Sequence, residues 1–130
     1  MERIIKKKCS RCKRNKELKD FYSSRREKSG VEYECKRCAS ARQKDIRAAN
    51  WRKILDHYGK ECFCCGEKIV EFLTIDHINK NGAEDRRKYN RGRLYAYIVR
   101  EDYPATFRIA CMNCNFSLGL RHYCPHQVRH

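Results

Sequence analysis

The sequence predicts a small α+β protein that is stabilised by zinc, with two zinc-binding units joined by a helix. Three observations support this prediction. The chain has 130 residues, of which 36% are charged, so its small hydrophobic core needs additional stabilisation. Ten cysteines are present, and most of them occur in C-x-x-C pairs. Short β-type segments and one long amphipathic segment alternate with these pairs.

The cysteines are expected to bind metal rather than to form disulfides. Residues 2–8 are mostly charged and contain no apolar signal segment, so we expect a cytoplasmic protein. In a reducing compartment, paired C-x-x-C spacings indicate tetrahedral zinc sites. No apolar run approaches the roughly 20 residues of a membrane-spanning helix, and no membrane partner is expected.

Residues 1–40 form the first predicted domain, a basic zinc ribbon. Residues 18–22 and 31–34 are expected to be its strands, with a turn at Ser29-Gly30 between them. The C-x-x-C pairs flank these strands at spacings typical of a ribbon. The predicted ligands of the first structural zinc are Cys9, Cys12, Cys35 and Cys38.

Residues 41–59 form the second predicted segment, a linking amphipathic helix. From residue 39 to residue 58 the chain contains no Gly or Pro. Trp51, Ile54, Leu55 and Tyr58 recur with helical spacing, and Gly59 is expected to cap the helix. The earlier turns are strongly basic. They are suited to a phosphate backbone, or equally to the solvated surface of a linker.

Residues 60–130 form the third predicted domain, in which an insertion separates two further C-x-x-C pairs. We expect strands at 72–78 and 107–110, a turn at 79–82, a helix at 94–99 and a short helix from about 115 to 120. The predicted ligands of the second structural zinc are Cys62, Cys65, Cys111 and Cys114.

The net charge of +15 indicates a polyanionic partner. Residues 1–53 contain 19 Lys/Arg and 7 Asp/Glu, a net charge of +12. Such a field attracts phosphates and gains salt-sensitive affinity from counterion release. A solubilising surface or an anionic membrane partner would explain the charge alone, but zinc-binding motifs favour DNA. The predicted DNA contacts are Lys6, Lys7, Lys8, Arg86, Arg87, Arg91 and Arg93.

Three residues suggest hydrolytic chemistry. Asp76 and His77 end a predicted strand, and Asn115 directly follows the last zinc cysteine. The zinc-binding pairs are expected to bring these side chains together. Histidine is suited to act as a general base near neutral pH. The oxygens of Asp76 and Asn115 suit catalytic Mg²⁺ or Mn²⁺, which phosphodiester hydrolysis uses to neutralise developing charge.

Each of these residues also has a purely structural interpretation. Asp76 could accept hydrogen bonds from a turn, and His77 could be a structural zinc ligand or a core residue. Asn115 could be a helix N-cap. His122 is a candidate further metal ligand on the last helix. Of the two remaining cysteines, Cys64 could compete for the second zinc, whereas Cys124 is expected to be a buried thiol.

The pattern resembles a known nuclease family. Asp76-His77-Ile78 after a C-x-x-C-G motif, with Cys111-x-x-Cys114-Asn115 and Gly119 following, is similar to the HNH nucleases of phages, particularly the recombination endonuclease VII group. The N-terminal part, with Asp20-Phe21-Tyr22 between its two C-x-x-C pairs, resembles the zinc ribbon that is often fused ahead of that module.

The resemblance implies a ββα-metal module and a DNA endonuclease, in which His77 is the base and Asp76 and Asn115 hold the divalent cation. It also implies a phage-encoded protein acting in the host cytoplasm. The sequence offers no equivalent of the family's middle Asn, which orients the base. A homodimer would suit a double-strand cutter with one site per chain. The alternatives are a non-catalytic zinc-finger adaptor that binds nucleic acid, or an interaction protein.

Overall fold

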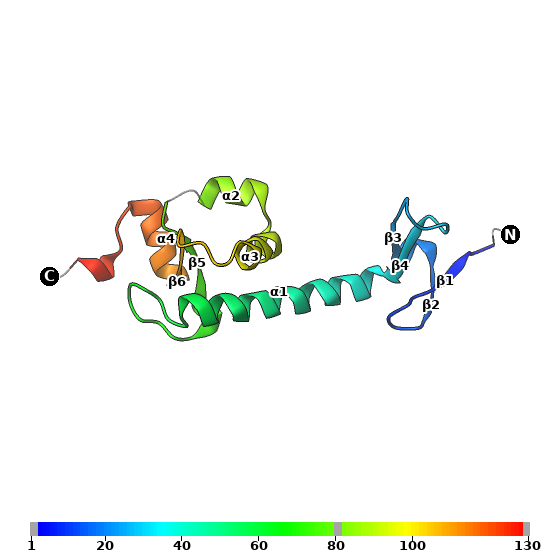
Figure 1. Ribbon diagram of the computed structural model, residues 1–130, viewed down its shortest axis with the longest axis horizontal. Coiled ribbons are helices and arrows are strands. Elements are labelled where there is room, and N and C mark those ends of the chain that lie inside the picture. Colours follow the sequence, from blue (N-terminus) through cyan, green and yellow to red (C-terminus); the bar gives the residue numbers. More distant parts are fainter. Residues whose placement is uncertain (1–2, 80–81, 129–130) are drawn as a thin grey trace. The chain divides into compact units, whose positions relative to one another are not determined.

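The computed structural model of the protein describes residues 3–79 and 82–128. The chain forms two compact units, Met1–Ile46 and Arg47–His130. The boundary between them falls within the long helix α1 (Lys36–Tyr58), drawn in cyan and green in Figure 1. The first unit therefore includes the start of the helix that the sequence assigns to a separate linker.

The first unit contains two antiparallel hairpins. Strand β1 (Lys6–Lys8) pairs with β2 (Asn15–Glu17), a hairpin that the sequence did not predict. After a 3₁₀ turn at Leu18–Asp20, β3 (Phe21–Ser23) pairs with β4 (Val31–Cys35). The predicted turn between the latter two strands is confirmed at Gly30, whose φ of 78° favours a residue without a side chain.

The core of the first unit is very small. Its fully enclosed side chains are Cys9, Phe21 and Cys35. Glu34 of β4 is also buried, and its carboxylate accepts hydrogen bonds from Arg42 of α1 at 2.8 and 2.7 Å. A core of this size offers little hydrophobic stabilisation, which makes cross-linking by metal the main available reinforcement.

The predicted helix is confirmed, but it begins at Lys36, ahead of the predicted start at residue 41 and directly after β4. Its apolar stripe lies in the second unit, where Ile54 and Leu55 are buried. The predicted cap is confirmed too. Gly59 has a φ of 108°, and its N–H donates to the carbonyl of Leu55 at 2.9 Å.

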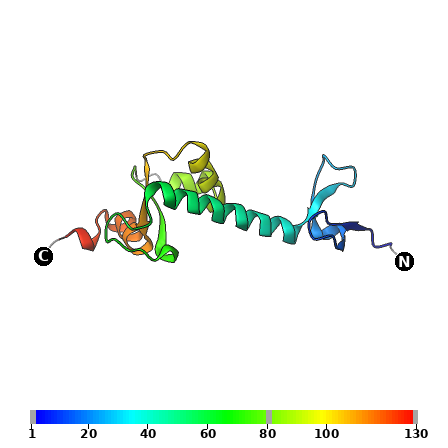
Figure 2. The same cartoon turned by 60° about the horizontal axis from the view of Figure 1, so that its bottom comes forward.

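The second unit is built around one hairpin. Strand β5 (Leu73–His77) pairs antiparallel with β6 (Phe107–Cys111), with Leu73 opposite Cys111 and His77 opposite Phe107. Helix α4 (Met112–Arg121) follows β6 directly and contacts both strands (Figures 1 and 2). The remaining elements are a 3₁₀ turn at Val70–Phe72, α2 (Gly82–Lys88), α3 (Arg91–Arg100) and a 3₁₀ turn at Pro125–Gln127.

Two predicted boundaries in this unit differ from the structure. Gly82, predicted to end a turn, is the first residue of α2, while Lys80 and Asn81 of that turn lie outside the described residues. Helix α4 begins at Met112 rather than near Asn115, because Sγ of Cys111 accepts a hydrogen bond from the N–H of Cys114 and caps the helix. Asn115 is therefore inside α4, and the N-cap interpretation is wrong.

The core of the second unit lies between this hairpin and helices α1, α3 and α4. Ile54 of α1 and Ile98 of α3 are completely buried, and Trp51 stacks on Tyr95 with ring centroids 5.2 Å apart. The hydroxyl of Tyr58 donates to the carbonyl of Pro104 at 2.6 Å. Among the described residues, no helix is long and apolar enough to cross a membrane.

Candidate metal centres and the end of strand β5

The first predicted zinc ligands come together. Cys9, Cys12, Cys35 and Cys38 each offer an Sγ atom, and all four lie within 4.8 Å of one another. Ligand atoms on a tetrahedral zinc ion lie roughly 3.3–3.8 Å apart, so small adjustments would close the site. Four thiolates in this arrangement suit structural zinc.

The backbone around the first cluster favours thiolate at Cys9. Burial raises the pKa of Cys9, but hydrogen bonds from the backbone N–H groups of Cys12, Cys35 and Arg11 lower it by more. The net effect is a pKa lowered to about 6. The N–H groups of Cys12 and Cys35 lie 3.5 and 3.3 Å from Sγ. By contrast, the side chain of Cys35, burial and the neighbouring thiols raise the pKa of Cys38 to about 12. The cluster thus holds a thiolate beside a thiol that must release its proton to bind metal.

The second predicted cluster also forms, from Cys62, Cys65, Cys111 and Cys114. Sγ of Cys65 lies 3.7 Å from Sγ of Cys111, close to the separation expected on zinc. Burial raises the pKa of Cys62, yet the backbone N–H groups of Cys65, Cys111 and Cys64 bring it down to about 7. The structure therefore brings together both sets of four cysteines that the sequence groups.

The two clusters share one local construction. In each, the residue after the first C-x-x-C pair has a positive φ, 63° at Lys13 and 78° at Gly66. Its N–H donates to the carbonyl of the first cysteine at 3.0 Å. The second pair of each cluster joins a strand to a helix, since α1 and α4 begin one residue after Cys35 and Cys111. These turns point the sulfur atoms of each cluster inward.

A third group of potential ligands was not predicted. Cys64, Cys114, Cys124 and His126 offer ligand atoms that also lie within 4.8 Å of one another. The predicted burial of Cys124 is confirmed, because the residue is 1% exposed. The sequence signals were the odd cysteine inside Cys62-x-x-Cys65 and the short Cys124-x-His126 spacing, neither of which forms a C-x-x-C pair.

His122 is not part of any of these groups among the described residues. It follows the last residue of α4 in the left-handed conformation, with a φ of 63°, and its side chain is exposed. The structure therefore gives no support to His122 as a further metal ligand.

Asp76 forms an ion pair rather than a turn contact. Its carboxylate is buried, and Oδ2 accepts a hydrogen bond from Nε of Arg108 at 2.6 Å. The two residues are direct partners in the β5–β6 register, which explains the contact. The Arg108 guanidinium also lies over the ring of Phe63, 3.5 Å from its centroid.

His77 lies in a separate and shielded environment. Its Nε2 atom is 2.9 Å from Oδ2 of Asp85 on α2, with both side chains largely buried. The carboxylate is off the direction of the ring N–H, so Nε2 is within ion-pair distance but forms no hydrogen bond. The ring meets Phe107 edge-on at 5.1 Å. Nδ1 faces Gly82, where an added Cβ would lie 3.3 Å away.

The side chains of the three predicted catalytic residues, Asp76, His77 and Asn115, are therefore not in mutual contact. Asp76 and His77 are neighbours on β5 and point to opposite faces of the strand pair. Asn115 lies in α4, half-buried, and no hydrogen bond or ion pair links it to either residue within the described chain. The partners Arg108 and Asp85 were not predicted, because nothing in the sequence relates residues that meet only across a hairpin or through the packing of a helix.

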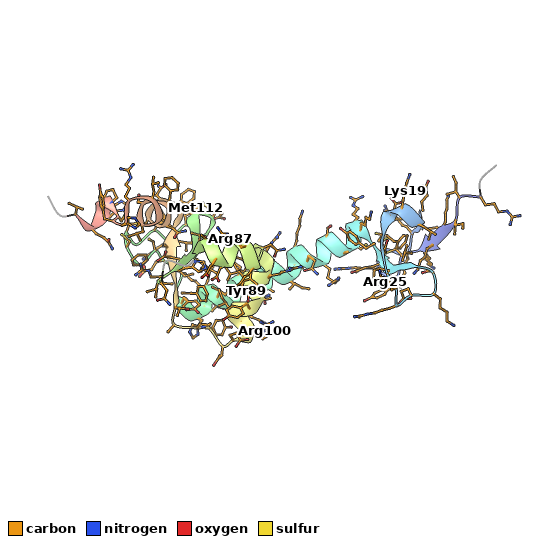
Figure 3. The ribbon with its side chains drawn as sticks, turned by 90° about the horizontal axis from the view of Figure 1, so that it is seen from above. Lys19, Arg25, Arg87, Tyr89, Arg100 and Met112 are labelled. Atoms are coloured by element: carbon orange, nitrogen blue, oxygen red, sulfur yellow. The ribbon has the colours of Figure 1, made fainter. Side chains whose placement is uncertain are left out.

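The residues predicted to contact DNA differ in how exposed their side chains are and in whether they already form hydrogen bonds within the protein. Lys7 is partly committed to the fold, since its ammonium donates to Ser29 Oγ at 2.8 Å and to the carbonyl of Val31 at 3.1 Å. The side chains that are exposed are Lys6, Lys8, Arg87 and Arg93, of which Arg87 is labelled in Figure 3. The side chains of Arg86 and Arg91 lie outside the described part of the structure.

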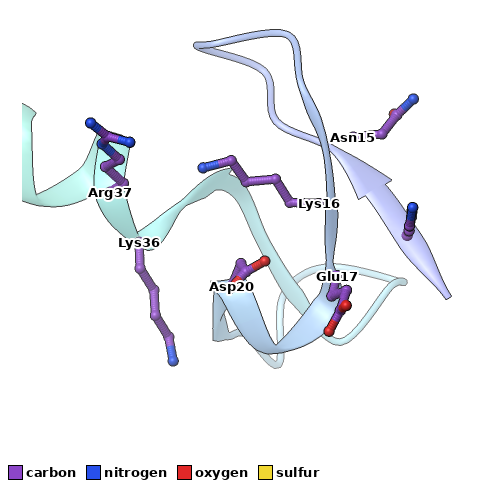
Figure 4. A pocket seen from close by; sticks show the side chains of 7 residues that line it. Asn15, Lys16, Glu17, Asp20, Lys36 and Arg37 are labelled. Atoms are coloured by element: carbon purple, nitrogen blue, oxygen red, sulfur yellow. The ribbon is translucent and has the colours of Figure 1, made fainter. Parts of the chain in front are cut away.

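An open, mainly basic cavity of about 500 Å³ lies in the first unit (Figure 4). Its charged lining comprises four basic and two acidic side chains, so it has a net positive charge. These residues are Lys6, Lys16, Lys36, Arg37, Glu17 and Asp20. Its lining adds Lys16, Lys36 and Arg37 to the basic residues that the sequence singled out.

Together these features define a small α+β protein with cysteine clusters that could hold zinc. The first cluster and its hairpins are compatible with a zinc ribbon. Comparisons with protein-family models, with curated proteins and with solved structures give no match.

Proposed function

We propose that the protein is a metal-dependent DNA endonuclease in which His77 activates the attacking water. The observation that carries this proposal is the environment of His77, a shielded imidazole at the end of β5 with one ring nitrogen beside a carboxylate. The contacts of α4 with β5 and β6, beside a cluster that includes Cys111 and Cys114, support it.

The carboxylate of Asp85 gives His77 a defined role. A small rotation of the ring would let Nε2–H donate to Asp85, which fixes the tautomer and leaves the lone pair on Nδ1. Nδ1 faces Gly82, which has no side chain to fill the space beside it. Nδ1 would then take the proton from water. Asp85 thus replaces the middle Asn of the resembled family in orienting the base.

Asp76 and Asn115 are the proposed ligands of Mg²⁺ or Mn²⁺. Carboxylate and amide oxygens suit these hard cations, and the metal would neutralise charge that develops on the phosphate. The ion pair with Arg108 competes for the same carboxylate oxygen. Arg108 would therefore leave Asp76 when the cation binds, and its guanidinium would then be free to bind a phosphate oxygen.

DNA is the proposed partner because exposed basic residues occur in both units. Lys6 and Lys8 lie on β1, and Lys6 also lines the cavity in the first unit. Arg87 and Arg93 lie on α2 and α3 of the second unit. The first unit, proposed as a DNA-binding zinc ribbon, carries most of the positive charge. Phosphate contacts of this kind provide affinity without sequence preference.

The decisive experiment incubates the purified chain with duplex or branched DNA and Mg²⁺ or Mn²⁺. We expect wild-type cleavage, and His77→Ala should reduce it by about 10²–10⁴-fold, the usual contribution of a general base. His122→Asn is the matched control, because His122 is exposed and outside the site. Cleavage by His77→Ala at the wild-type rate would disprove the mechanism.

A second candidate function is a non-catalytic zinc-finger adaptor that binds nucleic acid. The observation that favours it is the ion pair between Asp76 and Arg108, which already neutralises the proposed metal-binding carboxylate. An adaptor would bind DNA in a salt-dependent way, and neither Mg²⁺ nor the identity of residue 77 would alter its affinity. DNA binding with no cleavage under any divalent metal would favour the adaptor.

A further inference from the structure

We propose that the protein binds an additional zinc ion that is bridged to the second structural zinc by the thiolate of Cys114. Cys64, Cys124 and His126 would supply the remaining ligands of the additional ion. The second unit would then hold a two-zinc cluster, whereas the first unit would hold a single zinc.

The positions of the ligand atoms carry this inference. Nδ1 of His126 lies 3.3 Å from Sγ of Cys114 and 3.4 Å from Sγ of Cys124. These separations match ligand atoms that share a tetrahedral zinc ion, roughly 3.3–3.8 Å apart. The fourth atom, Sγ of Cys64, lies within 4.8 Å of the others.

Cys114 is the only residue common to the two clusters of the second unit among the described residues. Its side chain is completely buried, with the second cluster and the additional group both within reach of Sγ. A thiolate sulfur has more than one lone pair, so it can bind two metal ions at once. The bridge completes four ligands for each ion without recruiting any other side chain.

The ligand chemistry also balances the added charge. The two positive charges of the additional Zn²⁺ would be offset by thiolates at Cys64 and Cys124, and neutral His126 would add none. Cys124 is 1% exposed, so an unpaired thiolate there would be costly without a metal. Four protein ligands, of which Cys114 and Cys124 are buried, are typical of structural zinc rather than of an open catalytic site.

The additional zinc would fasten the end of the chain to the rest of the unit. Cys64 lies in the turn formed by Cys62-x-x-Cys65. Cys124 directly precedes the last 3₁₀ turn, Pro125–Gln127, and His126 lies within that turn. The backbone N–H of Cys64 already donates to Sγ of Cys62 at 3.4 Å. One ion would therefore connect segments that are about sixty residues apart in sequence, and its binding to the folded chain would stabilise the unit.

The metal content of the full-length chain tests the proposal. Native mass spectrometry of the zinc-loaded protein should give three zinc ions per chain, and two or fewer would overturn the proposal. In protein loaded with ¹¹³Cd, two of the three metal resonances should split each other through the shared sulfur of Cys114. Three metals without this splitting would overturn the bridge.

Variants identify the ligands. Cys124→Ser and His126→Asn should each reduce the content to two zinc ions and abolish the splitting. His122→Asn is the matched control and should retain three, because His122 is exposed and outside the clusters. Three zinc ions in His126→Asn would disprove the assignment. If a variant fails to fold, the wild-type metal count and the ¹¹³Cd spectrum decide the question alone.

Discussion

Nε2 of His77 lies 2.9 Å from Oδ2 of Asp85, and this approach joins the last residue of β5 to helix α2. Both side chains are more than four-fifths buried, at 13% and 15% exposure, so water offers little competition for either. The contact makes Asp85 a positioning residue for the proposed base. It also makes α2, a short and otherwise polar helix, part of the candidate site.

Asp85→Asn should reduce cleavage about ten- to hundredfold, by analogy with the cost of removing the carboxylate partner of a metal-bound histidine. The loss should appear in kcat, while KM for DNA remains unchanged, because Asp85 acts through His77 and not on the substrate. Steady-state kinetics on a fluorescent duplex measures both. Glu84→Gln, an exposed neighbour on α2, is the control. Equal rates for Asp85→Asn and Glu84→Gln would remove Asp85 from the mechanism.

Gly82→Ala should slow cleavage with little effect on stability. The new methyl group would lie 3.3 Å from Nδ1 of His77 and occupy space that the attacking water needs. Alanine at a helical position changes stability by about 1 kcal/mol or less, so thermal unfolding should hardly change. Gly119→Ala in α4 is the matched control, since its Cβ would meet no atom within 4 Å. A fully active Gly82→Ala would show that Nδ1 is not the reacting nitrogen.

Arg108→Gln should strengthen the binding of Mg²⁺ or Mn²⁺ while it weakens the fold. The substitution frees the carboxylate of Asp76 to bind metal. It also leaves this carboxylate buried without the Arg108 guanidinium, at a cost of about 1–3 kcal/mol in the free energy of unfolding. Thermal unfolding with and without divalent metal measures both effects. We expect the metal to stabilise Arg108→Gln more than the wild type. Arg100→Gln, an exposed arginine labelled in Figure 3, serves as the control. An identical metal response in all three proteins would argue against Asp76 as a ligand.

Zinc affinity should fall as the pH is lowered. The pKa of Cys38 is raised to about 12, so this thiol is protonated at neutral pH and must lose its proton when zinc binds. Cys9, with a pKa lowered to about 6, is already a thiolate at neutral pH and adds a second proton only below that value. We expect the dissociation constant of the first site to rise at least tenfold per pH unit near pH 7, and more steeply below pH 6. Competition between a chromogenic chelator and the full-length chain carrying Cys65→Ser and Cys124→Ser, which removes one ligand from each of the other two clusters, checks this. A pH-independent affinity would contradict it.

The structural framework is predictable from the sequence because its signals are local. A C-x-x-C pair closes its own turn, and the residue that follows it needs a positive φ, as Gly66 has. Helical spacing of Trp51, Ile54 and Leu55 likewise depends only on neighbours within two turns. The two clusters of four cysteines and the helix capped by Gly59 therefore follow from short stretches of sequence.

The candidate site is harder to predict because its contacts join distant segments. Asp76 meets Arg108 only through the register of β5 and β6, and His77 meets Asp85 only through the placement of α2. The group formed by Cys64, Cys114 and Cys124 also depends on how the last turn folds back. The sequence analysis expected Asp76 and His77 to come together, but successive strand residues point to opposite faces and these two side chains have different partners.

This alternation along β5 separates the ion pair from the imidazole. Arg108 and Asp85 approach the strand from its two faces, and among the described residues no hydrogen bond or ion pair links one pair to the other. Substitutions at well-separated sites that share no partner usually contribute additively to stability, within about 0.3–0.5 kcal/mol. The double variant of Arg108→Gln and Asp85→Asn should accordingly show the sum of the two single changes in unfolding free energy. A substitution in either pair would then need no compensating substitution in the other.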